Sequence, residues 1–164
     1  MSTWSRILFV PDEQAVAEAA DAWRWLIPEP WTIIFSSMFG GLFLEKQTGG
    51  AFWLECGTGM IERVADSASD LNAFLGGPRD EVWDDRVDEW FLPGFVQTLH
   101  DAGKVPGTGE CYGLTILPIF KGGTYTVDNA FVVPVREWLS LTGSMHEQMR
   151  DVPDGAQVRI QITD

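Results

Sequence analysis

The chemistry open to this 164-residue sequence starts from two cysteines, Cys56 and Cys111, and two histidines, His100 and His146. A cysteine nucleophile needs a neighbouring base to activate it, and histidine can fill that role. Either histidine could approach a cysteine in space, so a Cys/His hydrolase remains an alternative. Cys111 falls in an apolar run that predicts a strand, where burial raises the pKa of a thiol and makes it inert. We therefore expect structural roles for these residues and no catalytic set.

Metal and phosphate sites are not indicated either. The two cysteines are far apart and form no CxxC pair, which argues against a zinc site or a disulfide framework. The glycine pairs in FGGLF and KGGTY do not open a helix as G-x-G-x-x-G does, and no GK[ST] follows them. Asp128 and Asn129 stand at a strand entry, where short polar side chains commonly bond the backbone of a turn. We expect no metal and no cofactor.

Carboxylates are densest in the segment RDEVWDDRVDEWFLP, which predicts a helix with an acidic face. Paired carboxylates can serve as general acid and base, but these should be exposed and stay ionised. We interpret the segment as a partner-binding surface in which two tryptophans form a hot spot surrounded by steering charge. The alternative is that both tryptophans are simply the buried face of a solvated helix. The candidate partner-binding residues are Asp80, Glu81, Trp83, Asp84, Asp85, Asp88, Glu89 and Trp90.

Hydrophobic periodicity predicts the elements that would position these residues. An N-terminal helix should begin at Pro11 and bury Val16, Ala19, Ala20, Trp23 and Leu26, ending before Pro28. Residues 31–64 read as an antiparallel meander, with a hairpin turn at Gln47–Gly50. The later elements are helices capped by Ser67 or Ser69, across the acidic run, from Pro93 to Ala102 and from Arg136 to Met149, and strands in CYGLTILPIF, NAFVVPV and VRIQIT (158–163).

Strands that cluster instead of alternating singly with helices favour an α+β fold. We expect an antiparallel sheet, made of the meander and the C-terminal strands and packed by several helices. No repeat or long linker divides the chain, so residues 1–164 should form a single domain. Within it we distinguish an N-terminal helix region (1–37), a front half with the meander and the acidic helix (39–108), and a C-terminal part (109–164).

Composition limits the partners. The chain has 24 Asp and Glu against 11 Lys and Arg, a formal net charge of −13, and a field of that sign repels phosphate backbones and anionic lipids. We expect neither direct nucleic-acid binding nor membrane binding. The N-terminus lacks a signal-peptide pattern, no run is long enough for a membrane helix, and a reducing cytoplasm suits two isolated cysteines.

The C-terminal half resembles a known family. The run from Gly109 to Ile160 is similar to the C-terminal domain of bacterial type VI secretion immunity proteins of the Tde–Tdi DNase-immunity type, often found with a GAD-like N-terminal part. The matching residues are Cys111, Tyr112, Gly113, Pro118, Gly122, Gly123, Tyr125, Asp128, Asn129, Gly143, His146 and the closing DVPDG at 151–155. With the less distinctive front half, the resemblance covers Phe39 to Ile160.

This resemblance implies a non-enzymatic immunity protein that binds a cognate toxin effector, often a nuclease, and blocks its active site. An acidic inhibitor could occupy the basic groove with which a nuclease grips its substrate. The family motif marks the fold and does not map the binding surface. The competing readings are a ligand-sensing or scaffold module with a glycine-bounded pocket in the meander, and the Cys/His hydrolase.

Overall fold

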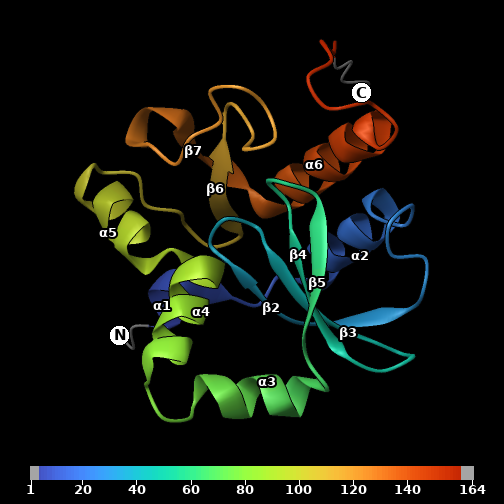
Figure 1. Cartoon of the computed structure of the whole chain (residues 1–164). Helices are drawn as coiled ribbons and strands as arrows, with labels where there is room; N and C mark the ends of the chain where they lie inside the picture. The colour runs from blue at the N-terminus through green and yellow to red at the C-terminus, as the bar shows by residue number, and fades with distance from the viewer. Residues whose placement is uncertain (1–3, 160–164) are drawn as a thin grey trace.

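The predicted meander is the central sheet of the structure, a computed structural model that describes residues 4–159. All of its strand pairs are antiparallel and lie in chain order (Figure 1). The turn between the third and fourth strands has positive φ at Gly49 (104°) and Gly50 (96°), which confirms the predicted hairpin. The edge strand β1 was not predicted, because two residues are too few to show a period. The strands are β1 (Leu8–Phe9), β2 (Trp31–Ser37), β3 (Leu42–Lys46), β4 (Ala51–Glu55) and β5 (Met60–Ala65).

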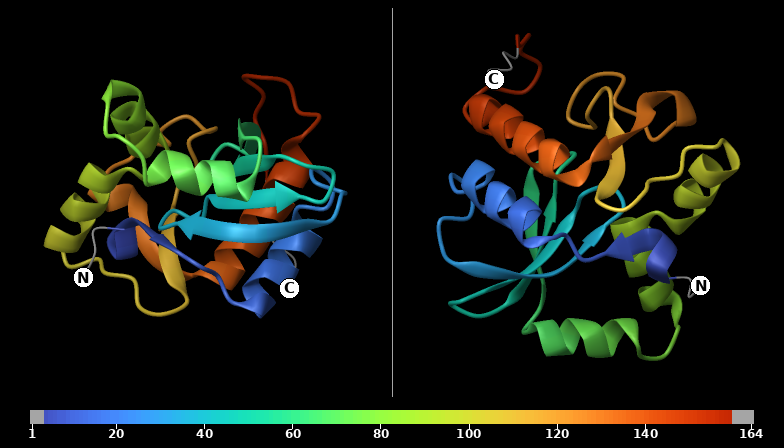
Figure 2. Two further views of the ribbon diagram at one scale, coloured as in Figure 1. Left: turned by 90° about the horizontal axis from the view of Figure 1, so that it is seen from below. Right: turned by 180° about the vertical axis from the view of Figure 1, so that it is seen from behind.

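The middle of this sheet is buried on both faces, so it separates two hydrophobic cores. Leu42 and Leu44 of β3 point into one core, while Phe43 between them points into the other. In β4, Leu54 and Trp53 divide in the same way. Figure 2 shows helices above and below the sheet. Strands covered on both faces carry apolar residues at successive positions, which explains the continuous runs GLFL and AFWL.

Helices α2 and α6 cover one face, and α3, α4 and α5 lie toward the other. The first predicted helix is shorter than expected: α2 begins after its Asp12 cap and ends at Ala22, and Ala15 is buried in it while Val16 and Ala20 are only half-buried. Ser67, one of two predicted caps, accepts from the Asp70 amide. The helices are α1 (Trp4–Ile7), α2 (Glu13–Ala22), α3 (Ala68–Leu75), α4 (Glu81–Phe91), α5 (Pro93–Asp101) and α6 (Val135–Met149).

The C-terminal strands form a separate two-stranded sheet and do not extend the meander. β6 (Glu110–Leu114) pairs with β7 (Ala130–Pro134), and the chain leaves the predicted run CYGLTILPIF after Leu114 to form a long loop. The two sheets touch where the Tyr112 amide donates to the Met38 carbonyl at 2.6 Å. The mixed α+β class is confirmed, with the strands divided between two sheets.

The last predicted strand is wrong where it can be checked. Val158 and Arg159 are exposed and belong to no strand, while residues 160–163 lie outside the described residues. Alternating Val-Arg-Ile-Gln-Ile-Thr satisfies the period of a strand, but no strand of the described residues pairs with Val158 and Arg159. Within residues 4–159, no helix combines the length and apolar character needed to cross a bilayer.

Candidate functional site

The cysteines are buried and their thiols are held in the neutral form. Cys111 lies on β6 with no exposed surface, and burial raises the pKa of its thiol. Cys56, which follows β4, donates from Sγ to the Gly40 carbonyl at 3.1 Å, and burial raises its pKa to about 12. A thiol with a raised pKa carries almost no thiolate at neutral pH. The predicted core role of Cys111 is confirmed, and Cys56 behaves in the same way.

His146 reaches the neighbourhood of Cys56 but does not contact its sulfur. The imidazole Nε2 lies 2.8 Å from the Cys56 backbone carbonyl, and the side chain is buried in α6. Burial lowers the pKa of the imidazole, so the neutral ring donates from Nε2 to this carbonyl. His100 lies apart in the last turn of α5 and is half-buried. Among the described residues, no thiol–imidazole hydrogen bond of the kind that activates a nucleophile is formed.

Asn129 has a structural role, as predicted for the Asp128–Asn129 pair. Its amide nitrogen donates to the carbonyls of Ile116 and Thr124, and its Oδ1 accepts from the Ile116 amide. Asp128 beside it is exposed. The single buried amide therefore closes the base of the loop that runs from β6 to β7, residues 115–129, and sets the path of that loop over the rest of the molecule.

The predicted acidic helix is α4, capped by Asp80, whose carboxylate accepts from the Trp83 amide at 2.8 Å. Its carboxylates point outward and its tryptophans inward: Trp83 is 7% exposed and Trp90 4%. This matches the alternative in which the indoles form the buried face of the helix. Each indole nevertheless borders a hollow, since Trp83 lines an apolar groove with Trp4 of α1, and Trp90 lines a second pocket. The exposed carboxylates are Asp80, Glu81, Asp84, Asp85, Asp88 and Glu89.

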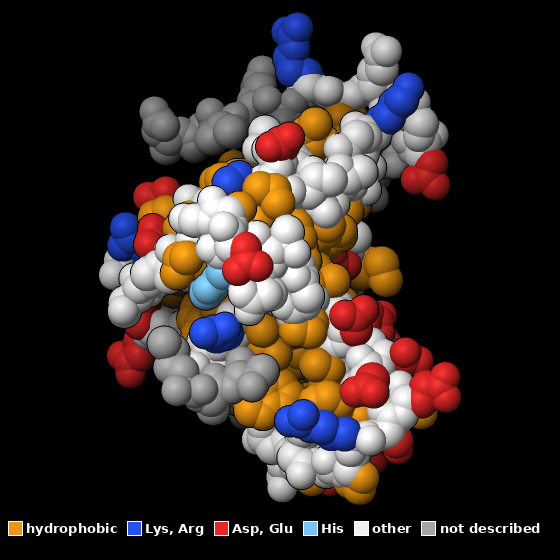
Figure 3. Space-filling view, turned by 90° about the vertical axis from the view of Figure 1, so that its left-hand side faces the viewer, with side chains coloured by type: hydrophobic (Ala, Val, Ile, Leu, Met, Phe, Trp, Pro, Cys, Tyr) orange, Lys and Arg blue, Asp and Glu red, His pale blue; other side chains and the backbone are white. Residues whose placement is uncertain are grey.

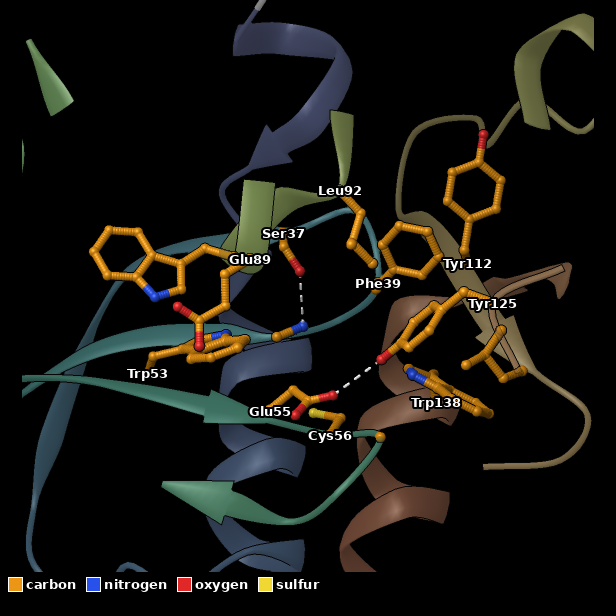
Figure 4. A pocket seen from close by; sticks show the side chains of 14 residues that line it. Ser37, Phe39, Trp53, Glu55, Cys56, Glu89, Leu92, Tyr112, Tyr125 and Trp138 are labelled. Atoms are coloured by element: carbon orange, nitrogen blue, oxygen red, sulfur yellow. Dashed lines mark hydrogen bonds between the residues drawn. The ribbon is translucent and has the colours of Figure 1, made fainter. Parts of the chain in front are cut away.

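The pocket that Trp90 lines lies where the two sheets meet. Figure 4 shows Trp53 of β4 on one side and Trp138 of α6 on the other, with Glu55 between them. Tyr125 of the 115–129 loop and Glu89 of α4 contribute a hydroxyl and a second carboxylate to the lining. Segments far apart in sequence thus supply one cavity, which we call the inter-sheet pocket.

Glycines make room for its indoles. A side chain on Gly40, which has φ of +77°, would come within 2.7 Å of the Trp138 ring, and one on Gly41 within 2.9 Å of Trp53 Nε1. A Cβ on Gly113 of β6 would likewise come within 2.9 Å of the Trp138 ring. The pair in FGGLF therefore carries the backbone between two tryptophans.

The polar groups of the inter-sheet pocket are unevenly satisfied. Glu55 accepts from the Tyr125 hydroxyl at 3.1 Å and from the Thr58 hydroxyl at 2.6 Å. Burial, and then the nearby Glu55 charge, raise the pKa of Tyr125. The buried indole N–H groups of Trp53, Trp90 and Trp138 have no hydrogen-bond partner among the described residues. Trp90 was a predicted partner-binding residue, but Trp53 and Trp138 were not predicted, because nothing in a strand or helix pattern signals that residues 53, 90 and 138 line one pocket.

Metal ligation is not supported within the part of the chain that the structure describes, where no three His, Cys, Asp or Glu side chains are arranged to hold an ion. A comparison with curated proteins finds no match. A family model described as T6SS immunity protein Tdi1, C-terminal, matches residues 72–146. The match runs from α3 to the last turns of α6, narrower than the resemblance drawn from Phe39 to Ile160. Residues 72–146, with α4, both strands of the second sheet and the 115–129 loop, are thus similar to this family of type VI secretion immunity proteins.

Proposed function

We propose that this protein binds a cognate toxin effector delivered by type VI secretion and neutralises it by covering the toxin's active or substrate-binding site. The family match over residues 72–146 carries the proposal. In this role the protein acts as a stoichiometric inhibitor and not as an enzyme. Both thiols are held neutral, and His146 bonds a carbonyl instead of a thiol, which supports the non-enzymatic reading.

We assign the toxin-binding surface to the exposed face of α4. The side-chain carboxylates of Asp84, Asp85 and Asp88 form no ion pair or hydrogen bond with any described residue. Arg86 on the same helix pairs with Glu62 and Glu89 and leaves these three charges uncompensated. Carboxylates at this density steer a basic partner and raise its association rate.

Apolar surface lies directly beside these charges. The groove lined by Trp4, Ile7, Trp83 and Val87 runs along α4, and Figure 3 shows hydrophobic side chains gathered next to a cluster of Asp and Glu on this side of the molecule. An apolar centre with a charged rim is the usual anatomy of a protein interface. The arrangement supports a partner that is bound by apolar contact and guided by charge.

A nuclease fits this surface best among toxin classes. A nuclease needs a basic groove for a polyanion, and a row of carboxylates can occupy that groove in place of phosphates. The nucleic acid that such a toxin would attack lies in the cytoplasm, so we place the action of the immunity protein there.

The first test is co-expression with the product of the gene beside this one, taken as the candidate toxin. The protein should form a stable complex with the toxin and restore growth to cells that make it. Failure to bind the toxin or to rescue growth would remove the proposed function.

The second test reverses the charge of the α4 face with the variant Asp84→Lys/Asp85→Lys/Asp88→Lys. A matched control, Glu13→Lys/Glu137→Lys/Glu147→Lys, changes the net charge equally at exposed carboxylates of α2 and α6 on the other face of the sheet. The α4 variant should slow toxin association about tenfold or more at low salt, with a smaller difference at high salt, and the control much less. Equal effects of the two variants would mean that net charge alone matters, and no effect would exclude α4 from the interface.

A further inference from the structure

We propose that the inter-sheet pocket binds an arginine side chain of the toxin, inserted next to the acidic face of α4. The inference deepens the proposed function and rests on it. It is carried by three observations on the pocket: the sign of its charge, its aromatic walls and its unpartnered N–H groups.

The pocket is acidic without a built-in counterion. Of the fourteen residues that line it, Glu55 and Glu89 are the charged ones, and neither Lys nor Arg is among them. Glu89 is paired with Arg86 at 3.1 Å, whereas Glu55 accepts hydrogen bonds only from neutral hydroxyls and has no cationic partner among residues 4–159. A half-buried carboxylate without a counterion is costly, so a cation that enters the pocket is favoured over an anion or a neutral group.

The walls suit a flat cation. Phe39, Trp53, Trp90, Tyr112, Tyr125 and Trp138 all line the cavity. The faces of aromatic rings attract cations, and a guanidinium stacks on them better than a compact ammonium does. A guanidinium also forms two parallel hydrogen bonds with one carboxylate. Glu55 can supply that carboxylate, because each of its oxygens can accept a further hydrogen bond besides the one from the Tyr125 or Thr58 hydroxyl. These features favour arginine over lysine.

The indole N–H groups require hydrogen-bond acceptors, which a cation alone does not supply. Trp53 is 9% exposed, Trp90 4% and Trp138 3%, and their Nε1 atoms are buried without acceptors in the described structure. Figure 4 shows the Trp53 and Trp138 rings facing the cavity from opposite sides. A guanidinium has no acceptor, so a free cation would leave these donors unsatisfied. A peptide segment that carries an arginine also brings backbone carbonyls. Because each Nε1 is closed to solvent in this structure, the indole rings must shift for these carbonyls to accept from them.

The position of the pocket connects it to the proposed interface. Glu89 lines the pocket and is also an exposed residue of α4, so the pocket adjoins the face that steers the toxin. Seven of the fourteen lining residues, among them Trp53 and Glu55, lie outside the segment 72–146 that matches the family model. The pocket is therefore formed jointly by the segment that matches the family model and by the front half of the chain. Residues of the front half can thus determine which toxin the protein binds.

The first arm of the test uses a small probe and the indole resonances of the ¹⁵N-labelled protein. The probe is Nα-acetyl-arginine amide, which carries a guanidinium and two amide carbonyls, and the control is Nα-acetyl-citrulline amide, which has a similar shape without the charge. The arginine probe should produce saturable shifts of the Trp53, Trp90 and Trp138 indole signals, and the citrulline probe should bind about tenfold or more weakly. Equal binding of the two would identify a site for neutral small molecules and overturn the proposal, as would no shift with either.

The second arm measures toxin affinity with Glu55→Gln, which keeps an acceptor for Tyr125 and Thr58 but removes the charge. The matched control is Glu45→Gln on the adjacent strand, a half-buried carboxylate outside the pocket. Glu55→Gln should weaken toxin binding about tenfold or more, and Glu45→Gln should leave it unchanged. Unchanged affinity of Glu55→Gln would overturn the pocket proposal while the proposed function stands. Failure of the unmodified protein to bind any toxin would instead overturn the proposed function, and the probe titration would still decide what the pocket binds.

Discussion

At the scale of single residues, burial decides what the titratable side chains can do. His146 of α6 is enclosed by the Trp23 ring, tilted against it at 5.5 Å, and by the turn at Gly59, where a side chain would come within 2.8 Å of the imidazole. Its Nε2 bonds the Cys56 carbonyl. The same histidine in an exposed loop would titrate near its ordinary value, so its sequence neighbours do not reveal its state.

The His146 environment predicts a pH dependence of stability. Burial lowers the pKa of the native imidazole below the ordinary value of 6.5, while the unfolded chain keeps that value. As the pH falls below about 6.5, the unfolded state therefore takes up the proton first and the native state loses stability, by at most about 1.4 kcal/mol per pH unit.

Urea unfolding at about pH 7.5 and about pH 5.5 measures this loss. His146→Gln keeps a side-chain N–H that can reach the Cys56 carbonyl but cannot titrate, so its stability should fall less over this interval than that of the unmodified protein. A parallel decline of the two proteins would show that His146 does not contribute, and that carboxylates alone cause the acid sensitivity.

At the scale of elements, the contact between α2 and α6 depends on a helical glycine. Gly143 lies in the interior of α6, where a Cβ would come 2.7 Å from the Ala22 carbonyl oxygen and 2.8 Å from the Ala22 Cβ. Beside it, Trp25 Nε1 donates to the Gly143 carbonyl, and Trp23 Nε1 donates to the Leu139 carbonyl, both at 3.1 Å. Close approach and indole hydrogen bonds hold the two helices together.

Two identical substitutions should therefore have opposite effects. Gly143→Ala gains up to about 1 kcal/mol in helix propensity, but the overlap with Ala22 should outweigh this gain and destabilise the protein by about 1–3 kcal/mol. Gly94→Ala in α5 meets no atom within 4 Å and should stabilise it by up to about 1 kcal/mol. Denaturant unfolding of both variants tests the pair. An increase in stability for Gly143→Ala would mean that α2 and α6 move apart without penalty.

At the scale of the whole molecule, the net charge of −13 sets a background against which the fold must hold. The α4 face contributes three carboxylates without counterions, and several of the ion pairs present are between exposed side chains and contribute little. Self-repulsion of this kind opposes the compact state and is relieved by screening.

Sodium chloride should consequently stabilise the protein. Raising the ionic strength from about 0.01 M to about 0.15 M shortens the Debye length from about 30 Å to about 8 Å. We expect the Tm to rise by about 2–4 °C, which corresponds to a gain on the order of 1 kcal/mol. Asp84→Asn/Asp85→Asn/Asp88→Asn should show a smaller salt effect. A Tm that is unchanged or lowered by salt would indicate that charge repulsion is not significant in the native state.

The sequence alone determined the elements whose signals are local. The meander, the hairpin at Gly49 and Gly50, and the amphipathic α4 with its outward carboxylates all follow from periodicity or turn chemistry within a few residues. A cap at Ser67 or Ser69 was also predicted, and the structure selects Ser67. Two predictions failed: the extra turn of the first helix and a strand at Val158. Both elements would have required packing partners, and a local pattern does not specify whether such partners exist. The family resemblance was readable because it rests on the order and spacing of residues.

Only the tertiary structure decided where these elements meet. The tertiary structure distributes the alternating residues of β3 between two hydrophobic cores. It also places His146 against a carbonyl instead of a thiol, and it buries both α4 tryptophans. It also assembled Trp53, Glu55, Trp90, Tyr125 and Trp138 into one pocket from segments far apart in the chain. Each of these outcomes depends on contacts between residues distant in sequence, and a pattern of neighbours carries no information on which distant surfaces will be buried together.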